Sequence, residues 1–317
     1  MSVTEIEWTN EHGDTHAGPL ETSTEQGDVI HCRTCGFLHV TPLPSPGTLR
    51  RLYEEHFYQE DKSDYLDRAR EDEKWLRLMF DLRLNRISKL LGGADRPRIL
   101  DIGCGPGDFL AACQDRGWQG TGIEPSPVAT AFCQDRGLNV RQGFFGADTA
   151  AEMGTFDAVH MSEVLEHIAD PQEVLKAAHG ILRDGGVLAV STPNDYNPFQ
   201  ETLVTERDFR QWWVVPDHHL NYFTFSSLEA LILTCGFTPV ARTTNFPMEM
   251  FLLMGQDYTS DPKLGRQLHG WRKSFDLTLA ANQSEALEAY YDSLAAAGLG
   301  RLTIVFAQKS DPSGGPS

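Results

Sequence analysis

A glycine-rich segment is the first feature of the sequence that could do chemistry. Residues 98–110 are RILDIGCGPGDFL, in which Gly103, Gly105 and Gly107 alternate with other residues between a strand-like run and a helix-like run. Glycine adopts backbone angles denied to other residues and has no Cβ atom, so its backbone can lie close to a ligand. At the carboxyl end of a strand, such a loop is typical of nucleotide-binding α/β folds.

Two carboxylates limit which nucleotide would fit this loop. Asp101 lies two residues before the first glycine, where it would repel a pyrophosphate and suit a cationic group. Glu124 ends the next predicted strand, where a carboxylate can accept hydrogen bonds from both ribose hydroxyls. Together they describe an adenosine ligand that carries an ammonium group and no phosphate. S-adenosylmethionine meets that description.

The glycine spacing also separates this site from its usual rival. Nicotinamide-dependent oxidoreductases have the pattern G-x-G-x-x-G, whereas here the third glycine comes one position early and Asp108 follows it. An oxidoreductase that uses NAD is therefore a disfavoured alternative.

The surrounding sequence must supply the elements that position this loop. Short apolar runs alternate with helix-like stretches from about residue 96 onward, which predicts a parallel sheet with right-handed crossovers and helices on both faces. A late apolar run, RLTIVFAQKS (301–310), is predicted to join the same sheet. The predicted strands are RILDIG, GTGIE, NVRQG, FDAVHMS and GGVLAVSTP.

These segments, with the long block FDAVHMSEVLEHIADPQEVLKAAHGILRDGGVLAVSTPN, resemble the class I S-adenosylmethionine-dependent methyltransferases over about residues 96–246. The resemblance implies an α/β, Rossmann-like sheet that is parallel except for one late antiparallel strand. It also implies that the glycine loop lies along the cofactor, with Asp101 near the amino end and Glu124 and Pro125 at the ribose.

The same resemblance implies further contacts with the cofactor. Gly143 and Phe144, after the third strand, would flank the adenine. Met161, Ser162 and Glu163, after the fourth strand, would lie near the reacting methyl group. A helix-cap or core role is preferred for the nearby Glu166 and His167.

A pair of histidines after the fifth strand offers a general base. His218 and His219 lie in WWVVPDHHLNYF, and adjacent side chains of an extended segment point in opposite directions. HLNYF resembles the H-L-x-Y-F element of sugar C-methyltransferases, whose catalytic histidine aligns with His219. Asp217 and His218 replace the His-Glu pair of that family. His219 is predicted to be the base, with His218 and Tyr222 as further catalytic candidates; a structural loop hinge is the alternative.

These observations predict an enzyme that methylates a small-molecule or sugar-like acceptor, with oxygen favoured over carbon as the methylated atom. Sugar C-methylation is one alternative. A second is a non-catalytic protein that binds the cofactor and serves as a sensor or scaffold. Fold does not determine the substrate, so the acceptor class follows from the resemblance alone.

A closely spaced cysteine pair near the amino terminus suggests a metal. Cys32 and Cys35 form a CxxC pair, and His12 and His16 precede it in NEHGDTHAG. Two thiolates and two imidazoles would complete a closed structural zinc site. His31 and His39 are substitutes for the histidine ligands, and two reduced thiols without metal are the alternative. The segment HCRTCGFLHVTPLPSPGTLRRLYEEHFY resembles one that leads into methyltransferases of sugar and surface-glycan pathways.

Composition restricts the partners. The 317 residues include 27 Lys or Arg and 45 Asp or Glu, giving a net charge of -18, which disfavours a nucleic-acid partner. No apolar run approaches the ~18 residues that would span a bilayer, and no basic-then-apolar signal begins the chain. A cytoplasmic protein without a membrane partner is expected. The apolar FPMEMFLLMG (246–255) suits a core segment or a homodimer contact.

The predicted organisation has five parts. Residues 1–92 form an amino-terminal segment with the CxxC knuckle and a helical cap. Residues 93–246 form the cofactor-binding core, and 247–300 form a helical insert. Residues 301–311 form the last core strand, and 312–317 form a disordered tail.

Overall fold

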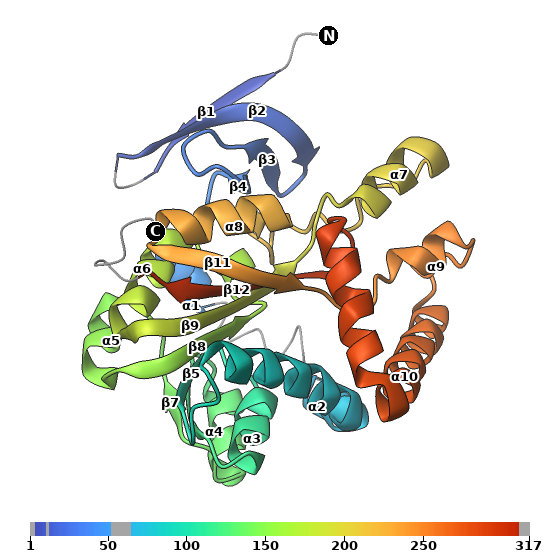
Figure 1. Cartoon of the computed structure of the whole chain (residues 1–317). Coiled ribbons are helices and arrows are strands. Elements are labelled where there is room, and N and C mark those ends of the chain that lie inside the picture. The colour runs from blue at the N-terminus through green and yellow to red at the C-terminus, as the bar shows by residue number, and fades with distance from the viewer. Residues whose placement is uncertain (1–3, 11–12, 52–64, 311–317) are drawn as a thin grey trace, which may run out of the picture.

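The computed structural model describes residues 4–10, 13–51 and 65–310, and two sheets organise this part of the chain (Figure 1). The larger sheet has seven strands in the order β11-β12-β9-β8-β5-β6-β7. Six of these strands run in one direction, whereas β12 runs antiparallel between β9 and β11. The predicted α/β sheet with a late antiparallel strand is thus confirmed. The strands are β5 (Arg98–Ile102), β6 (Gln119–Glu124), β7 (Val140–Gln142), β8 (Phe156–Ser162), β9 (Leu182–Pro193), β11 (Phe237–Thr243) and β12 (Leu302–Lys309).

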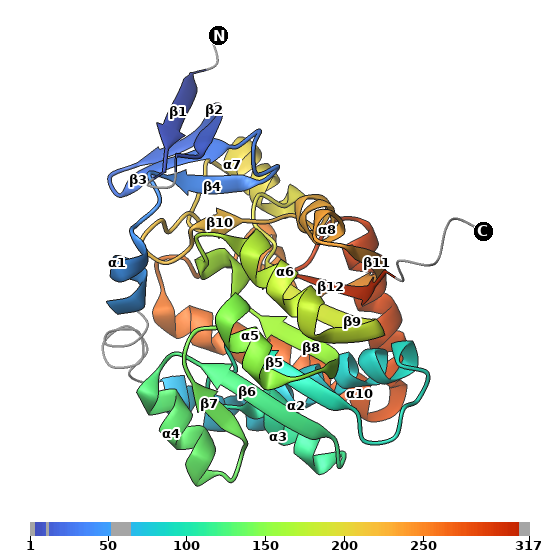
Figure 2. The same ribbon diagram turned by 90° about the vertical axis from the view of Figure 1, so that its left-hand side faces the viewer.

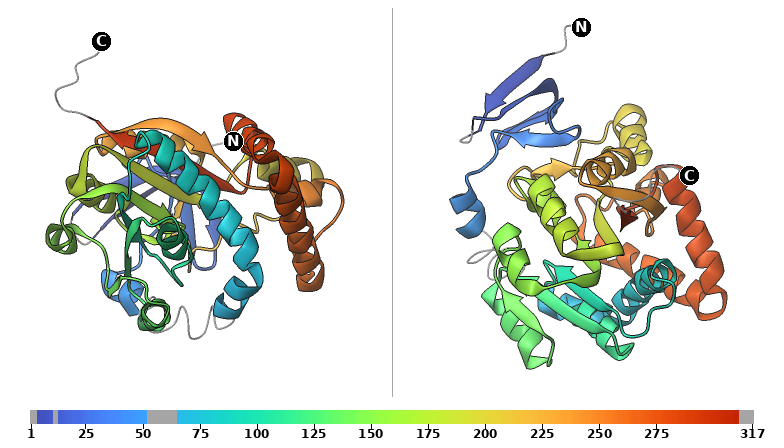
Figure 3. Two further views of the ribbon diagram at one scale, coloured as in Figure 1. Left: turned by 60° about the horizontal axis from the view of Figure 1, so that its bottom comes forward. Right: turned by 60° about the vertical axis from the view of Figure 1, so that its left-hand side comes forward.

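Successive side chains of a strand point to opposite faces of the sheet, so alternate residues pack in two different apolar layers. Ile99 packs with side chains of α2 (Tyr65–Leu90) and α3 (Asp108–Asp115). Leu100 packs in the layer that includes α5 (Ala147–Met153), α6 (Pro171–Ile181) and α8 (Phe225–Thr234). Both faces of the sheet are therefore covered, and Figure 3 shows α2 and α3 together on one of them. Burial on both faces explains why the central strands are continuous apolar runs.

The smaller sheet differs from the expectation of a turn-rich knuckle followed by helices. It has the order β1-β2-β3-β4-β10 and lies at one end of the molecule (Figure 2). The paired strands Glu5–Thr9 and Thr15–Thr24 are mostly exposed or half-buried, so their sequences are polar and carry no continuous apolar run. Its strands are β1 (Glu5–Thr9), β2 (Thr15–Thr24), β3 (Gly27–His31), β4 (Leu38–Thr41) and β10 (Asn221–Tyr222).

The strand β10 joins the two parts of the chain. It belongs to the HLNYF segment, which follows β9, yet it pairs with β4 of the smaller sheet. Outside this connection, helix α1 (Pro46–Arg51) follows β4, and helix α4 (Pro127–Asp135) follows β6. The β10 segment also bonds to the larger sheet, because the Asp195 N–H donates to the Phe223 carbonyl. The smaller sheet is therefore anchored to the carboxyl edge of the larger sheet by main-chain hydrogen bonds.

Three helices lie together beside the last strands (Figure 1): α7 (Pro198–Arg207), α9 (Glu249–Leu253) and α10 (Pro262–Ala296). The long helix α10 is interrupted at Gln283, whose φ and ψ are -144° and 50°. Its buried Asp276 accepts hydrogen bonds from Trp75 of α2, at 2.7 Å, and from Tyr291. In the described part of the chain, no helix combines the length and apolar character needed to cross a membrane.

Gly300 should be indispensable where the insert meets β12. Its φ is +115°, and an added Cβ would lie 1.9 Å from the Thr244 hydroxyl, which donates to the Leu302 carbonyl. Gly300→Ala should lower the free energy of unfolding by ~1–3 kcal/mol from backbone strain, with the clash adding to that loss. Gly298→Ala is the control, because its φ is +74° but its Cβ would meet open space. Thermal unfolding should give a lower midpoint for Gly300→Ala, and equal midpoints would contradict this account.

Candidate functional site

A cavity of about 860 Å³ opens at the carboxyl edge of the parallel strands. The loops that follow β5, β6, β7 and β8 all contribute to its wall. From β5 the strand order runs to β6 and β7 on one side and to β8 and β9 on the other, and α/β sheets bind ligands at such a switch point. The smaller sheet forms the opposite wall. Of the predicted cofactor contacts, six line this cavity: Gly103, Glu124, Pro125, Gly143, Phe144 and Glu163.

The glycine loop owes its shape to its three glycines. Gly103, Gly105 and Gly107 have φ values of 66°, 51° and 82°, which other residues rarely adopt. An added Cβ would come within 2.6 Å of Val164 at Gly103 and within 2.5 Å of Leu138 at Gly107. Substitution at either position is therefore blocked by the backbone and by the neighbouring side chains.

Glu124 links this loop to the next strand. One carboxylate oxygen accepts the Gly105 N–H at 3.0 Å, and the other accepts the Ser126 N–H at 2.9 Å. The side chain is buried and faces the cavity, and its burial raises the pKa of the carboxyl to about 7 despite those two hydrogen bonds. The carboxylate is thus held in place by two main-chain N–H groups at the wall of the cavity.

Asp101 lies behind the loop. It is buried, and its carboxylate is 2.7 Å from His160 Nδ1. Burial lowers the pKa of His160, so the neutral ring donates from Nδ1 to Asp101 and accepts at Nε2 from Arg83, 3.1 Å away. Among the described residues, the cavity wall includes Gly103 but not Asp101. Its contact with the amino end of the cofactor stays a prediction, and sequence reasoning missed both His160 and Arg83.

The three residues predicted beside the methyl group lie at different depths. Met161 is fully buried in the core. The Ser162 hydroxyl is 2.9 Å from Ser191 and accepts from Arg83. Glu163 is exposed, has a φ of 56° and lines the cavity.

The predicted catalytic residues of the HLNYF segment do not share one direction. Tyr222 is buried among Val29, Tyr196 and Trp213, and its hydroxyl accepts the Val215 N–H at 3.2 Å, which favours a packing role. The carbonyl of His218 accepts a hydrogen bond from His167 Nδ1 at 2.6 Å. In the described part of the chain, His167 lines the cavity, and the ring of His219 lies beside it with centroids 5.1 Å apart.

The LEHI turn, η2 (Leu165–His167), is therefore the element that presents an imidazole to the cavity. Asn221 fixes this turn by donating to the carbonyls of Leu165 and Ile168, at 2.8 and 2.7 Å. Ligand atoms of Glu166, His167 and His219 lie within 4.8 Å of one another, so this group could also hold a cation. Nothing in the spacing of the sequence indicated that the turn, and not the HH pair, faces the cavity.

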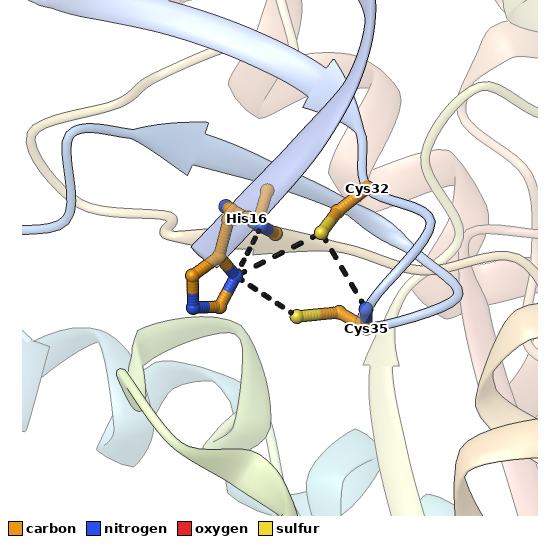
Figure 4. Close-up of side chains that lie close together, drawn as sticks. His16, Cys32 and Cys35 are labelled. Atoms are coloured by element: carbon orange, nitrogen blue, oxygen red, sulfur yellow. Dashed lines mark hydrogen bonds between the residues drawn. The ribbon is translucent and has the colours of Figure 1, made fainter. Parts of the chain in front are cut away.

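A second group of donors lies where the smaller sheet meets the cavity. Ligand atoms of His16, Cys32, Cys35 and His39 all lie within 4.8 Å of one another. Figure 4 shows the first three pointing toward a common centre from β2 and the CxxC turn. His16 Nδ1 is 3.3 Å from Cys35 Sγ, 3.7 Å from Cys32 Sγ and 3.2 Å from His39 Nε2. His12 lies outside the described residues.

These separations match a tetrahedral zinc site. Zinc bonds of about 2.3 Å to sulfur and about 2.0–2.1 Å to nitrogen place tetrahedral ligands about 3.5 Å apart for sulfur and nitrogen, and about 3.3 Å apart for two nitrogens. The His39 Nδ1 atom lies 2.7 Å from the Val40 carbonyl, and donating to it leaves Nε2 as the ligand atom. The contact with Cys35 lowers the pKa of Cys32, which favours a thiolate.

Comparison with known proteins identifies the family. A model described as a methyltransferase domain matches residues 64–242, which is more than half of the chain. The chain belongs to this methyltransferase family. The predicted methyltransferase family is confirmed, and S-adenosylmethionine is the cofactor that the sequence predicts for it.

The methyltransferase is similar to curated enzymes named ubiquinone biosynthesis O-methyltransferase. It is 38% identical to one from Pseudomonas aeruginosa over 119 residues, which cover 36% of this chain and 51% of that protein. It is 29% identical to one from Ruegeria pomeroyi over 187 residues, covering 53% and 75%. The chain spans about half the length of the first of these relatives. Among solved structures, the plantazolicin methyltransferase BamL, in complex with a triazolic analog and SAH, shares the fold: 16% identity, TM-score 0.51, covering 83% and 94% of the two chains.

The residues present fit this cofactor. The buried carboxylate of Glu124 faces the cavity, the glycine loop provides a turn without side chains, and Gly143 and Phe144 line the same space. A cavity of about 860 Å³ is in the range of small-molecule sites.

Cofactor affinity should depend on pH through Glu124. The carboxylate must be ionised to accept two ribose hydroxyls, and its pKa is about 7, so affinity should be full above pH 7 and fall below it. Calorimetry with S-adenosylhomocysteine should show about tenfold weaker binding at pH 6 than at pH 8. Glu124→Gln should bind weakly at both values and lose the dependence. A flat profile in the wild-type protein would contradict the assignment.

Proposed function

We propose that this methyltransferase transfers a methyl group to an oxygen atom of a small-molecule or sugar-like acceptor. The observation that carries the proposal is the continuity of the cavity. Its wall runs from the cofactor loops at Gly103 and Glu124 to His167 and Asn221, beneath the smaller sheet. One continuous space can therefore hold the donor and a small acceptor together. The O-methyltransferase names of the curated relatives support oxygen as the methylated atom.

The work of the protein in this reaction is mainly positioning. Bound S-adenosylmethionine supplies an electrophilic methyl group on a sulfonium. Glu124 would hold the ribose, and the glycine loop would lie along the cofactor. Holding two reactants in line can contribute ~7–11 kcal/mol to lowering a barrier. The smaller sheet closes the cavity, and excluding water favours a step in which charge is dispersed.

We infer that His167 removes the proton from the acceptor hydroxyl. Its Nδ1 atom donates to the His218 carbonyl, so Nε2 is the basic nitrogen, and it lies 3.8 Å from Oε1 of the buried Glu166. His219, whose ring lies beside it, serves as a positioning residue. This inference moves the base from His219, the sequence-based candidate, to a neighbour that lines the cavity.

The proposal is tested by following label from the cofactor into small molecules of a metabolite extract. His167→Ala should reduce that transfer by ~10²–10⁴-fold, the usual contribution of a general base. Its affinity for S-adenosylhomocysteine should stay unchanged. His219→Ala should lose less, and His31→Ala, at an exposed position, should lose nothing. A larger loss in His219→Ala would return the base to His219, and a wild-type protein that labels nothing would favour the non-catalytic alternative.

We further propose that His16, Cys32, Cys35 and His39 bind a structural zinc ion. The ligand separations support it, and four protein ligands leave no open position for chemistry. The ion would fix β2, the CxxC turn and β4 to one another at the wall of the cavity.

Metal analysis distinguishes this ligand set from the set predicted from the sequence, which has His12 in place of His39. Protein purified without a histidine tag should contain about one zinc per chain. His39→Ala and Cys35→Ser should each lose it, whereas His12→Ala and His31→Ala should keep it. Zinc near zero in the wild-type protein, under non-chelating conditions, would refute the site; loss in His12→Ala would restore the original set.

A further inference from the structure

Three side chains that commonly ligate metal ions meet at the LEHI turn, beside the wall of the cavity. They are Glu166 and His167 of η2 and His219 from the segment before β10. Their ligand atoms all lie within 4.8 Å of one another, and His167 Nε2 is 3.8 Å from Glu166 Oε1. One carboxyl group and two imidazoles from two separate segments therefore lie around a common centre.

The carboxyl group of Glu166 is buried without a hydrogen-bond donor. Its side chain is 1% exposed, and among the described residues neither Oε1 nor Oε2 has a hydrogen-bond partner. Leaving a buried polar group unpaired costs about 1–3 kcal/mol, and more if the group is charged. Protonation alone would not satisfy this carboxyl, because its O–H would need an acceptor and His167 Nε2 is too far away at 3.8 Å. A cation between the carboxylate and the imidazoles would supply the missing partner.

The hydrogen bonds of the turn give His167 the tautomer that a metal ligand needs. Its Nδ1 atom donates to the His218 carbonyl at 2.6 Å, which leaves the lone pair on Nε2. Histidines that bind metals usually donate their other N–H to a carbonyl or a carboxylate, which fixes the orientation of the ring. The turn is also tied to the strand segment, because the Leu220 N–H donates to the Glu166 carbonyl at 2.7 Å. The ligand positions on η2 are therefore ordered before any ion binds.

The group can be reached from the cavity. His167 lines the cavity wall with 17% of its side chain exposed, and His219 is half-buried. Three protein ligands leave at least one coordination position for a water molecule or a solute. Two nitrogens and one oxygen suit zinc, cobalt or nickel, whereas magnesium and calcium prefer oxygen ligands alone. The proposed structural zinc site differs, because it has four ligands and two of them are thiols.

We propose that Glu166, His167 and His219 bind a divalent transition-metal ion, and that the bound ion blocks methyl transfer. The Nε2 atom of a neutral imidazole has one lone pair, so it cannot ligate an ion and also take a proton from the acceptor. The protein without an ion at this site is then the active form. The blocking role rests on the proposed function, which assigns the proton to this nitrogen, whereas the binding of the ion does not.

Cobalt(II) tests the binding, because its absorption spectrum reports its ligands. Full-length protein, purified without a histidine tag, first receives one equivalent of zinc, which the thiolates of Cys32 and Cys35 take up preferentially. It is then titrated with cobalt chloride. The protein should bind about one cobalt ion per chain, with a spectrum that lacks the near-ultraviolet band of a cobalt–thiolate bond. A titration that shows no such ion overturns the inference.

Variants assign the cobalt ion to these side chains. Glu166→Gln should weaken cobalt binding at least about tenfold, since even the hydrogen-bond partners of metal ligands contribute that much. Should this variant fail to fold, His219→Ala replaces it with the same expected loss. His218→Ala is the matched control, because it removes an adjacent imidazole and keeps the carbonyl to which His167 donates. Cobalt affinity that stays equal in the wild-type protein and in the variants of Glu166 and His219 overturns the assignment.

Transfer of label from the cofactor into small molecules of a metabolite extract tests the blocking role. At a cobalt concentration about ten times the dissociation constant, transfer should fall about tenfold, because few sites stay free. Glu166→Gln should need about tenfold more cobalt for the same relative loss. Transfer that stays constant or rises while cobalt fills the site overturns the blocking role. A protein that binds cobalt but labels no molecule contradicts the proposed function and the blocking role with it, whereas the metal site is then supported by the titration alone.

Discussion

The carboxylate of Glu124 is the contact on which the cofactor site depends. It accepts main-chain N–H groups from Gly105 and Ser126, and so joins the loop after β5 to the turn after its own strand. Three glycines would otherwise leave that loop many conformations, because glycine loses more freedom than other residues on folding. Burial opposes the charged form of this carboxyl, and it raises the pKa to about 7. A carboxylate held in this way is already oriented toward hydroxyl donors before any ligand arrives.

A second level of organisation depends on the HLNYF segment, which serves two sheets at once. Through β10 it pairs with β4 and thereby holds the smaller sheet over the cavity. Through Asn221 it fixes the LEHI turn that carries His167. His39, one of the proposed metal ligands, lies on β4 itself. The order of the amino-terminal sheet and the position of His167 are therefore linked through one short strand, β10. The helices α7 and α9 carry Gln200 and Glu249, which are buried and hydrogen-bonded to each other.

The parts that sequence predicted are those in which burial on both sides makes a strand continuously apolar. The seven-stranded sheet, the glycine loop and the acid at the end of β6 all follow from local patterns. The smaller sheet was missed because β1 and β2 are largely exposed and polar, whereas β3, β4 and β10 are only five, four and two residues long. His39 was only a substitute ligand, since β3–β4 pairing, not spacing, brings it to the CxxC turn. The choice between His167 and His219 depends on side-chain direction, which no local pattern fixes.

The distribution of buried charge gives these separate features one electrostatic character. Burial raises the pKa of Glu124, Glu166 and Asp195, all of which lie at the carboxyl edge of the sheet. Burial therefore favours the neutral form of these carboxyls, whereas a nearby positive charge favours the ionised form. A cationic donor would supply such a charge, and this attraction weakens once the sulfonium has become a neutral thioether. An alkoxide on the acceptor would be disfavoured beside buried carboxyl groups, as any second anion would. An imidazole that takes the proton as the methyl group moves avoids forming that anion, and this is the physical reason for a base at the wall of the cavity.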